Sequence, residues 1–271
     1  MDTLANIYCI NVRSSTDRRK RMVNRFKVAG IEEKVTFIDA IPYNSSLIDY
    51  YAGYNNNKLE HDKVKRNVIS CKASHIKAIR QFLSESPSTY YDENNSSTKN
   101  NNIVDNYAII CEDDIMLSND FLNRYNETIQ NLPDNTPLIC LSYLLWQYEG
   151  IKWAGKNINI ENICTMGPDV WGTQMYMISR AYAIEVIEKY DKTNYVLKSI
   201  KSDHILTSEL ITRKSGGYIA YPPLAIEDCI YSSIAYVDHT KSNHMQALKF
   251  FGYENYNKGE LDDASPLSKK I

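Results

Sequence analysis

The most constraining feature of this sequence is an apolar run, Ala108 to Cys111, that passes directly into three acids, Glu112, Asp113 and Asp114. The run is short, uncharged and rich in β-branched side chains, which predicts a buried strand of a parallel sheet. The acids then stand at the carboxyl end of that strand, where open α/β sheets bind ligands. If the chain stays extended there, Glu112 and Asp114 point to one side of the strand and Asp113 to the other.

Two interpretations of the three acids remain open. Adjacent carboxylates repel one another and burial would raise their pKa values, so a bound divalent cation would relieve the repulsion. Hard cations prefer oxygen ligands, and a cation held there would grip a phosphorylated ligand. The alternative is a solvated acidic turn after the strand, and a string of three acids is too short to decide between the two.

The overall composition excludes some classes of partner. The 271 residues are enough for one large α/β domain or two small ones, and the formal net charge of -2 gives no reason to expect a nucleic-acid partner. The six cysteines form no Cys-x-x-Cys pair. Three of them, Cys9, Cys111 and Cys140, lie in apolar runs, where they pack as small hydrophobes. This usage fits a reducing compartment.

The sequence predicts neither secretion nor a membrane anchor. The first residues lead directly into a strand without a signal-peptide pattern. The longest apolar run, 137–146, is too short to span a membrane. We therefore expect a protein without a transmembrane segment that works in the cytoplasm, or in the host cytoplasm or virion if the source is viral.

The chain opens with a β–α–β pattern. Strands are predicted at Ile7–Val12 and Lys34–Ala40. Between them the pattern predicts a helix over Asp17–Ala29, with the preceding serines as caps and Gly30 at its end. A ligand site is therefore expected near residues 11–19, at the end of the first strand.

The remaining elements are expected to alternate as in an α/β domain. Helices are predicted at 68–83, 119–132, 180–190 and 202–210, and strands at 138–145, 158–164, 173–178 and 217–220. A low-complexity stretch rich in Ser and Asn, 84–106, predicts a surface insertion, and a polar tail runs from 238 to 271. We expect one domain spanning 1–271.

Several short motifs follow one another along the chain. They are Ile10-Asn-Val12 with Asp17-Arg-Arg19, Phe37-Ile-Asp-Ala40, Cys71-x-x-Ser-His75, Ala108-Ile-Ile-Cys-Glu-Asp-Asp114, Trp171-Gly-Thr-x-x-Tyr176, Asp203 in Ser-Asp-His-Ile-Leu206, and Tyr221-Pro222 with Ser232-Ser-Ile234. This series resembles glycosyltransferase family 25, which includes bacterial lipopolysaccharide β-galactosyltransferases and the animal collagen hydroxylysine galactosyltransferases. The resemblance covers most of the chain, from Ile7 to Ile234.

The resemblance implies a GT-A fold, a Rossmann-like mixed sheet flanked by helices. It also implies an inverting hexosyltransferase with a UDP-sugar donor, with galactose as the family default and glucose or N-acetylglucosamine as rivals. The acceptor would be a hydroxyl group of a glycan, as in lipopolysaccharide biosynthesis, or of a protein. Glu112-x-Asp114 occupies the place of the GT-A Asp-x-Asp motif, so Glu112 and Asp114 would hold Mn²⁺ or Mg²⁺.

Side-chain chemistry and the resemblance together give candidate donor-binding residues. Arginine suits phosphate geometry, so Arg18 and Arg19 would contact the diphosphate, and a solvated basic first turn is the alternative. The further candidates are Asn11, Asp39 and Ala40 at the ends of the first two strands, Ser74 and His75 on the helix at 68–83, Asp113 and Glu112, and Trp171, Thr173 and Tyr176 as a wall for a sugar. For Ser74, His75 and Tyr176 a packing role is the alternative.

Inversion by direct displacement needs a base for the acceptor hydroxyl. The resemblance places Asp203 in that role, and a helix-capping acid is the alternative. A further metal ligand is expected late in the chain, where the sequence does not choose among Glu227, Asp228, His239 and His244.

Two other functions would use the same acids. A metal-dependent phosphohydrolase would also need a dense cluster of His and Asp, and Asp203-His204 is the closest approach to one. A catalytically inactive protein that binds nucleotide sugars would be expected to lack the acidic triplet or Asp203, and both are present. An active transferase is therefore the favoured interpretation, and its acceptor and oligomeric state stay open.

Overall fold

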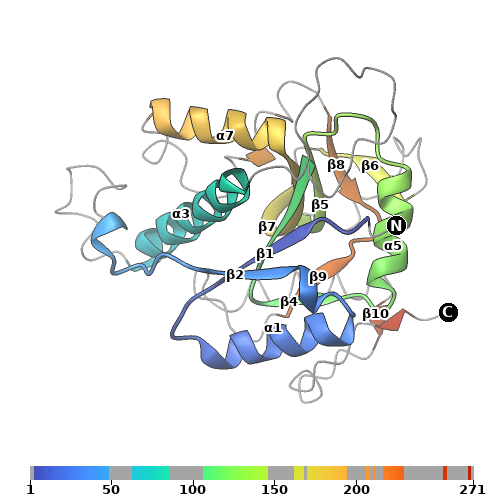
Figure 1. The fold of residues 1–271 in the computed structure, drawn as a ribbon, viewed down its shortest axis with the longest axis horizontal. Helices are drawn as coiled ribbons and strands as arrows, with labels where there is room; N and C mark the ends of the chain where they lie inside the picture. Colours follow the sequence, from blue (N-terminus) through green and yellow to red (C-terminus); the bar gives the residue numbers. More distant parts are fainter. Residues whose placement is uncertain are drawn as a thin grey trace.

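The structure is a computed structural model that describes residues 3–48, 63–85, 106–145, 162–167, 170–193, 206–207, 210, 216–228, 253–254 and 268–269. Within these residues seven strands form one sheet in the order β2-β1-β3-β7-β5-β8-β6 (Figure 1). Its strands are β1 (Asn6–Asn11), β2 (Val35–Asp39), β3 (Tyr107–Glu112), β5 (Leu138–Leu145), β6 (Ile163–Thr165), β7 (Val170–Ser179) and β8 (Gly217–Ala220). Two short pairs accompany it, β4 (Ile115–Leu117) with β9 (Ala225–Glu227) and β10 (Tyr253–Glu254) with β11 (Ser268–Lys269).

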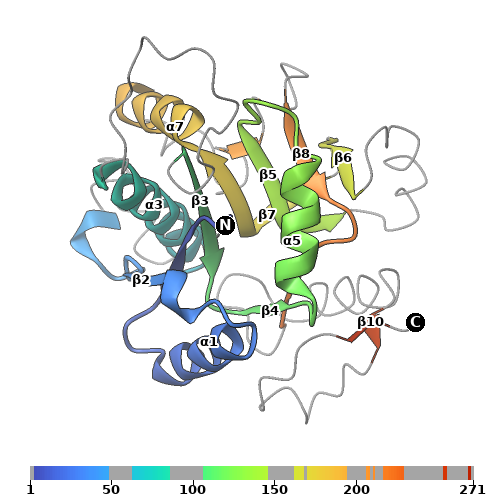
Figure 2. The same cartoon turned by 45° about the vertical axis from the view of Figure 1, so that its right-hand side comes forward.

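Helices cover both faces of the sheet, as Figure 2 shows from a second side. They are α1 (Thr16–Val28), α3 (Lys63–Ser84), α5 (Phe121–Gln130) and α7 (Arg180–Thr193), with a short 3₁₀ turn at Glu32–Lys34. Along β3, Ala108 and Ile110 pack in the core with α3 and α7, whereas Ile109 and Cys111 pack in the core with α1 and α5. Because β3 is buried on both faces, its sequence is an uninterrupted apolar run.

The β–α–β opening expected from the sequence is confirmed. β1 and β2 pair in parallel with Asn11 opposite Asp39, and α1 lies between them in the chain. α1 buries Met22 and Phe26 against the sheet. Gly30 follows the helix with a φ of 66°, a conformation that glycine adopts without strain. The expected serine cap is not formed at Ser15, which makes no side-chain hydrogen bond to the first turn.

The sheet around the acidic strand is mixed and not parallel. β3 is parallel to β1 but antiparallel to β7, with Cys111 opposite Met175. The start of β7 therefore lies at the same edge of the sheet as the ends of β1 and β3. At this edge β4 pairs antiparallel with β9, which places Ile115 opposite Glu227. Segments far apart in the sequence thus meet at the carboxyl end of β3.

The α/β class expected from the sequence is confirmed, and most other elements occur with small shifts of their ends. β7 is longer than the strand expected at 173–178, and the strand expected at 158–164 is described only at β6. The stretch 84–106, the helix expected at 202–210 and the tail from 238 lie outside the described residues except for a few positions. Among the described helices, none has both the length and the apolar character needed to cross a membrane.

Candidate functional site

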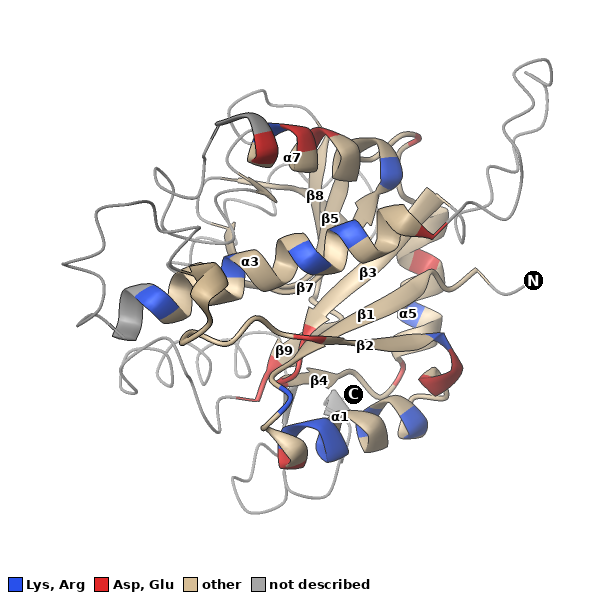
Figure 3. Ribbon diagram, turned by 60° about the vertical axis from the view of Figure 1, so that its left-hand side comes forward, with Lys and Arg blue, Asp and Glu red and all other residues tan. Residues whose placement is uncertain are grey.

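The three acids lie where the sequence predicts, at the carboxyl end of β3, but the strand ends at Glu112 and a turn follows. The alternation of side-chain directions expected for an extended chain therefore ends at Glu112. Asp113 and Asp114 both form ion pairs with Arg18 of α1, at 2.8 Å in the case of Asp113. Asn11, at the end of β1, donates its amide to Asp113 over 2.6 Å. Figure 3 shows acidic residues near the end of β9 and basic residues on α1 below them.

The two aspartates are buried, with 6 % and 7 % of their surfaces exposed, which excludes a solvated acidic turn. Burial is the main cause that raises the pKa of each, and Glu227 is the strongest negative neighbour of Asp114. Arg18 acts in the opposite direction, yet the pKa of Asp114 stays well above its ordinary value. Burial alone would lower the pKa of Arg18, but the two aspartates raise it.

Buried oxygen atoms remain unsatisfied at this place. Oδ1 of Asp114, Oδ1 of Asn11 and Oε1 of Gln174 have no hydrogen-bond partner within the described part of the chain. Such atoms are rare in folded proteins. Carboxylate and amide oxygens are the ligands that hard divalent cations prefer, so the chemistry of these atoms suits Mn²⁺ or Mg²⁺. Among the described residues, however, the acids beside Arg18 are not drawn together into a set of three ligand atoms.

Glu112 faces β7 and α3, and not α1. Its Oε1 accepts a hydrogen bond from the hydroxyl of Thr173 over 3.0 Å and lies 3.4 Å from Nε2 of His75. Nδ1 of His75 lies 3.2 Å from the hydroxyl of Tyr176. Burial alone would raise the pKa of Glu112, but the contacts with His75 and Thr173 outweigh it and lower the pKa, which keeps the carboxylate ionised. Burial and the charge of Glu112 raise the pKa of Tyr176, so the phenol stays neutral.

Of the late-chain candidates that the structure describes, Glu227 is the one beside the acids. It stands opposite Ile115, and its negative charge contributes to the raised pKa of Asp114. Asp228 instead forms a buried ion pair with Arg25 at 2.9 Å, and its N–H donates to the carbonyl of Asp114. His239, His244 and the predicted base Asp203 lie outside the described residues.

Two predicted donor-site residues have other contacts in the structure. The guanidinium carbon of Arg19 lies 4.2 Å from the ring centre of Phe37, so Arg19 does not join Arg18 on the acids. The hydroxyl of Ser74 accepts a hydrogen bond from the N–H of Ile41 and donates to the carbonyl of Ser70. These contacts support the packing alternative for Ser74.

The remaining predicted residues lie along the same edge of the sheet. Asp39 and Ala40 end β2 beside Asn11, whose carbonyl accepts a hydrogen bond from the N–H of Ala40. Asp39 is exposed, and its carbonyl accepts a hydrogen bond from Lys77. Trp171 lies near the start of β7, two residues before Thr173.

Two residues of the site are not singled out by the sequence, Gln174 and Arg25. Gln174 places its amide nitrogen 3.5 Å from Glu227. Gly172 permits this arrangement, because its φ is +100° and a Cβ atom there would lie 2.2 Å from the Gln174 side chain. Arg25 also donates to the carbonyl of Ile115. Its sequence signal is a charge within the apolar stripe of α1.

Comparison with known proteins identifies the family. The chain matches glycosyltransferase family 25, described as an LPS biosynthesis protein family, over residues 4–206. The chain belongs to glycosyltransferase family 25. The matched region contains every residue of the contacts described above except Glu227 and Asp228. In this family 25 member, the seven-stranded mixed sheet flanked by helices confirms the mixed α/β architecture that the resemblance implies.

Other comparisons add little to this assignment. A search of curated proteins gives no match. Among solved structures, the family 25 chain is similar to one described as a glycosyltransferase involved in the glycosylation of the major capsid of PBCV-1. That likeness has a TM-score of 0.45 and 10 % sequence identity, and covers 90 % of this chain and 98 % of the other.

Proposed function

We propose that this family 25 glycosyltransferase is an inverting hexosyltransferase that moves a hexose from a UDP-sugar to a hydroxyl group of a glycan or protein. Galactose is the first candidate, and glucose and N-acetylglucosamine are its rivals. The observation that most directly supports the proposal is the buried acidic cluster, in which Asp114 pairs with Arg18 yet keeps one carboxylate oxygen without a partner among the described residues. A purely structural ion pair would be expected to satisfy that oxygen.

Asp114 and Glu112 are the proposed ligands of a divalent cation, Mn²⁺ or Mg²⁺. Glu227 is the late-chain carboxylate that we add to this set, because it lies close enough to raise the pKa of Asp114. When bound, such a cation supplies Lewis-acid stabilisation of the charge on the departing diphosphate. Asp113 is already engaged by Asn11 and Arg18, and is proposed to orient Arg18.

Arg18 is proposed to bind the diphosphate. Both of its ion pairs use Nη2. The donors on Nη1 and Nε point in different directions, and each is proposed to donate a single hydrogen bond to a phosphate oxygen, because a guanidinium suits phosphate. The side chain is 17 % exposed, so it is held by the acids and still borders solvent. Arg19 would need to leave Phe37 to take part.

The acceptor side of the proposal depends on the family resemblance. Asp203 is the proposed base, and loss of transfer with retained UDP binding in Asp203→Asn would support that role. Trp171, Thr173 and His75 are proposed to line the sugar subsite.

We also propose one domain that works in a reducing cytoplasm as an enzyme of glycan biosynthesis. This agrees with the free thiols of the described cysteines at positions 9, 71, 111, 140 and 164.

The test is UDP release from UDP-galactose, UDP-glucose and UDP-N-acetylglucosamine, with Mn²⁺ or with a chelator, first without and then with candidate acceptors. Asp114→Asn keeps the shape of the side chain and removes its charge. Asp120→Asn is the matched control, because Asp120 is exposed at the start of α5. We expect Mn²⁺-dependent release with one sugar, unchanged in Asp120→Asn and reduced roughly 100-fold or more in Asp114→Asn.

Each rival function has its own result in this assay. Release of UMP and a hexose 1-phosphate in place of UDP would indicate a phosphohydrolase that cleaves the diphosphate. Nucleotide binding without turnover, when acceptors are also present, would indicate an inactive binding protein. A chain that binds none of the nucleotides would contradict the site built around residues 112–114.

A further inference from the structure

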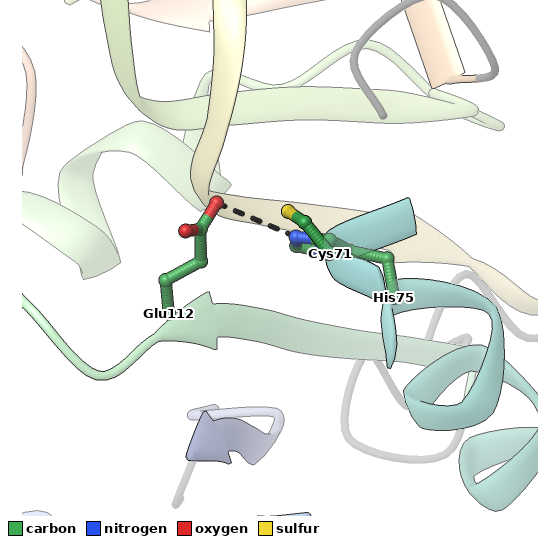
Figure 4. Close-up of side chains that lie close together, drawn as sticks. All are labelled: Cys71, His75 and Glu112. Atoms are coloured by element: carbon green, nitrogen blue, oxygen red, sulfur yellow. Dashed lines mark hydrogen bonds and ion pairs between the residues drawn. The ribbon is translucent and has the colours of Figure 1, made fainter. Parts of the chain in front are cut away.

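Three side chains of different chemistry meet on the α3 side of Glu112. Cys71 and His75 lie one turn apart on α3 and therefore on the same face of that helix. The thiol of Cys71, a ring nitrogen of His75 and a carboxylate oxygen of Glu112 all lie within 4.8 Å of one another. Figure 4 shows these side chains converging from the helix and from the end of β3.

We propose that Cys71, His75 and Glu112 form a binding site for a zinc-type divalent cation. Thiolate, imidazole and carboxylate are the ligand types that Zn²⁺ takes in proteins, and a thiolate disfavours Mn²⁺ and Mg²⁺. A tetrahedral zinc site places neighbouring ligand atoms roughly 3.3–3.7 Å apart. The separation between His75 and Glu112 is 3.4 Å, and the sulfur of Cys71 lies within 4.8 Å of a ring nitrogen of His75 and of a carboxylate oxygen of Glu112.

The surroundings of the ligands also suit a metal. A metal-binding histidine nearly always forms a hydrogen bond through its second ring nitrogen, and Nδ1 of His75 lies 3.2 Å from the hydroxyl of Tyr176. A phenol both donates and accepts, so this contact persists when the ring proton moves to Nδ1 and Nε2 binds a metal. The hydroxyl of Thr173 donates a hydrogen bond to the carboxylate of Glu112, which orients this second proposed ligand.

The proposed site is distinct from the acidic cluster and goes beyond the transferase proposal. The acidic cluster consists of Glu112, Asp113 and Asp114, of which the two aspartates pair with Arg18 of α1. The proposed zinc-type site has only Glu112 in common with that cluster. The Glu112 side chain is 25 % exposed, whereas His75 is buried. Solvent therefore reaches the carboxylate, which leaves room for a water molecule as the fourth ligand of a site with three protein ligands.

A titration with Co²⁺ tests the site with the metal alone and no nucleotide. Co²⁺ substitutes for Zn²⁺ in such sites, and a thiolate ligand produces a sulfur-to-cobalt absorption band in the near ultraviolet. We expect the reduced wild-type protein to show this band, and Zn²⁺ to abolish it by displacement. Cys71→Ser should remove the band, His75→Gln should weaken binding at least ~10-fold, and Tyr176→Phe should weaken it about 10–100-fold.

Two control variants should keep the band. Cys164→Ser removes a buried cysteine on β6 that is not part of the cluster. Asp114→Asn changes the acidic cluster but keeps all three proposed ligands, so a retained band would show that the metal does not need Asp114. Circular dichroism measures whether each variant is folded. If Cys71→Ser is unfolded, His75→Gln tests the proposed site in its place.

A folded wild-type protein without the band, or a band that persists in both Cys71→Ser and His75→Gln, would overturn the proposal. Because the titration contains no nucleotide, this outcome leaves the transferase proposal intact. A failure of UDP release equally leaves the metal titration unaffected.

Discussion

Replacing Arg18 by glutamine tests the acidic cluster most directly. Arg18 is the cation that the described structure places on both aspartates. Arg18→Gln keeps a polar side chain but removes the charge. It therefore leaves the buried carboxylates of Asp113 and Asp114 without that cationic partner.

The size of the effect follows from the separation of the charges and their burial. Two unit charges ~4 Å apart interact by about 4 kcal/mol at an effective dielectric constant of ~20. Removing one partner of a buried ion pair lowers the free energy of unfolding by about 3–5 kcal/mol. Because Arg18 is 17 % exposed, solvent screens part of this interaction, and we expect a loss of about 2–4 kcal/mol at neutral pH.

The direction of the pH dependence follows from the pKa shifts. Burial raises the pKa values of both aspartates in the wild type, and loss of Arg18 would raise them further. A carboxyl group with a raised pKa favours the folded state while it is protonated, and this contribution is lost as the pH rises through that pKa. The deficit of Arg18→Gln should therefore be largest at neutral pH and shrink as the pH falls.

Urea unfolding at about pH 7.5 and about pH 5 measures both quantities, and a Mn²⁺ titration adds a second readout. Without nucleotide, Arg18 competes with a divalent cation for Asp113 and Asp114. We therefore expect Arg18→Gln to bind Mn²⁺ more tightly than the wild type and to regain stability on binding it. Donor hydrolysis should nevertheless fall, because a ligand of the diphosphate is lost.

The adjacent arginine provides the matched control. Arg19→Gln removes the same charge from the same helix, but Arg19 lies over Phe37 and not on the acids. We expect this variant to keep the Mn²⁺ affinity and the pH profile of the wild type. Arg18→Gln with wild-type stability at neutral pH, or with an equal deficit at both pH values, would refute the reasoning.

Three further variants test the surroundings of the site. Gly172→Ala would strain the backbone and displace Gln174, so unfolding assays should show a loss of about 1–3 kcal/mol together with slower donor hydrolysis. Arg25→Met leaves the buried carboxylate of Asp228 without that partner, and the free energy of unfolding should fall by about 3–5 kcal/mol in the same assay. Ser74→Ala removes two hydrogen bonds to the backbone and should cost about 1–3 kcal/mol without changing the KM for the donor. A raised KM with unchanged stability would instead indicate contact between Ser74 and the donor.

The parts of the fold that could be predicted depend on local pattern. The apolar run of β3 is buried on both faces, and such a run differs from the alternating pattern of a half-exposed strand. The parallel β1–β2 pair follows from the β–α–β opening. Because parallel strands end at the same edge of a sheet, Asn11 and Arg18 could be expected near the acids from order in the sequence alone.

The parts that could not be predicted depend on the direction in which each side chain points. Neighbouring residues of an α-helix point about 100° apart, so Arg18 reaches the acids while Arg19 packs on Phe37. The sequence does not show that the chain turns after Glu112. It also does not show that β7 runs antiparallel, which is what brings Thr173 to Glu112.

The position of Glu112 gives a physical reason for a glutamate, and not an aspartate, at the start of the acidic triplet. Its carboxylate has to extend from the end of β3 to Thr173 on β7 and His75 on α3, and a side chain one methylene shorter would fall short of both. Glu112 is also the residue that the two proposed cation sites share. A cation bound on the α3 side would hold Glu112 away from Asp114, so zinc-type and hard divalent cations are expected to oppose one another at this residue.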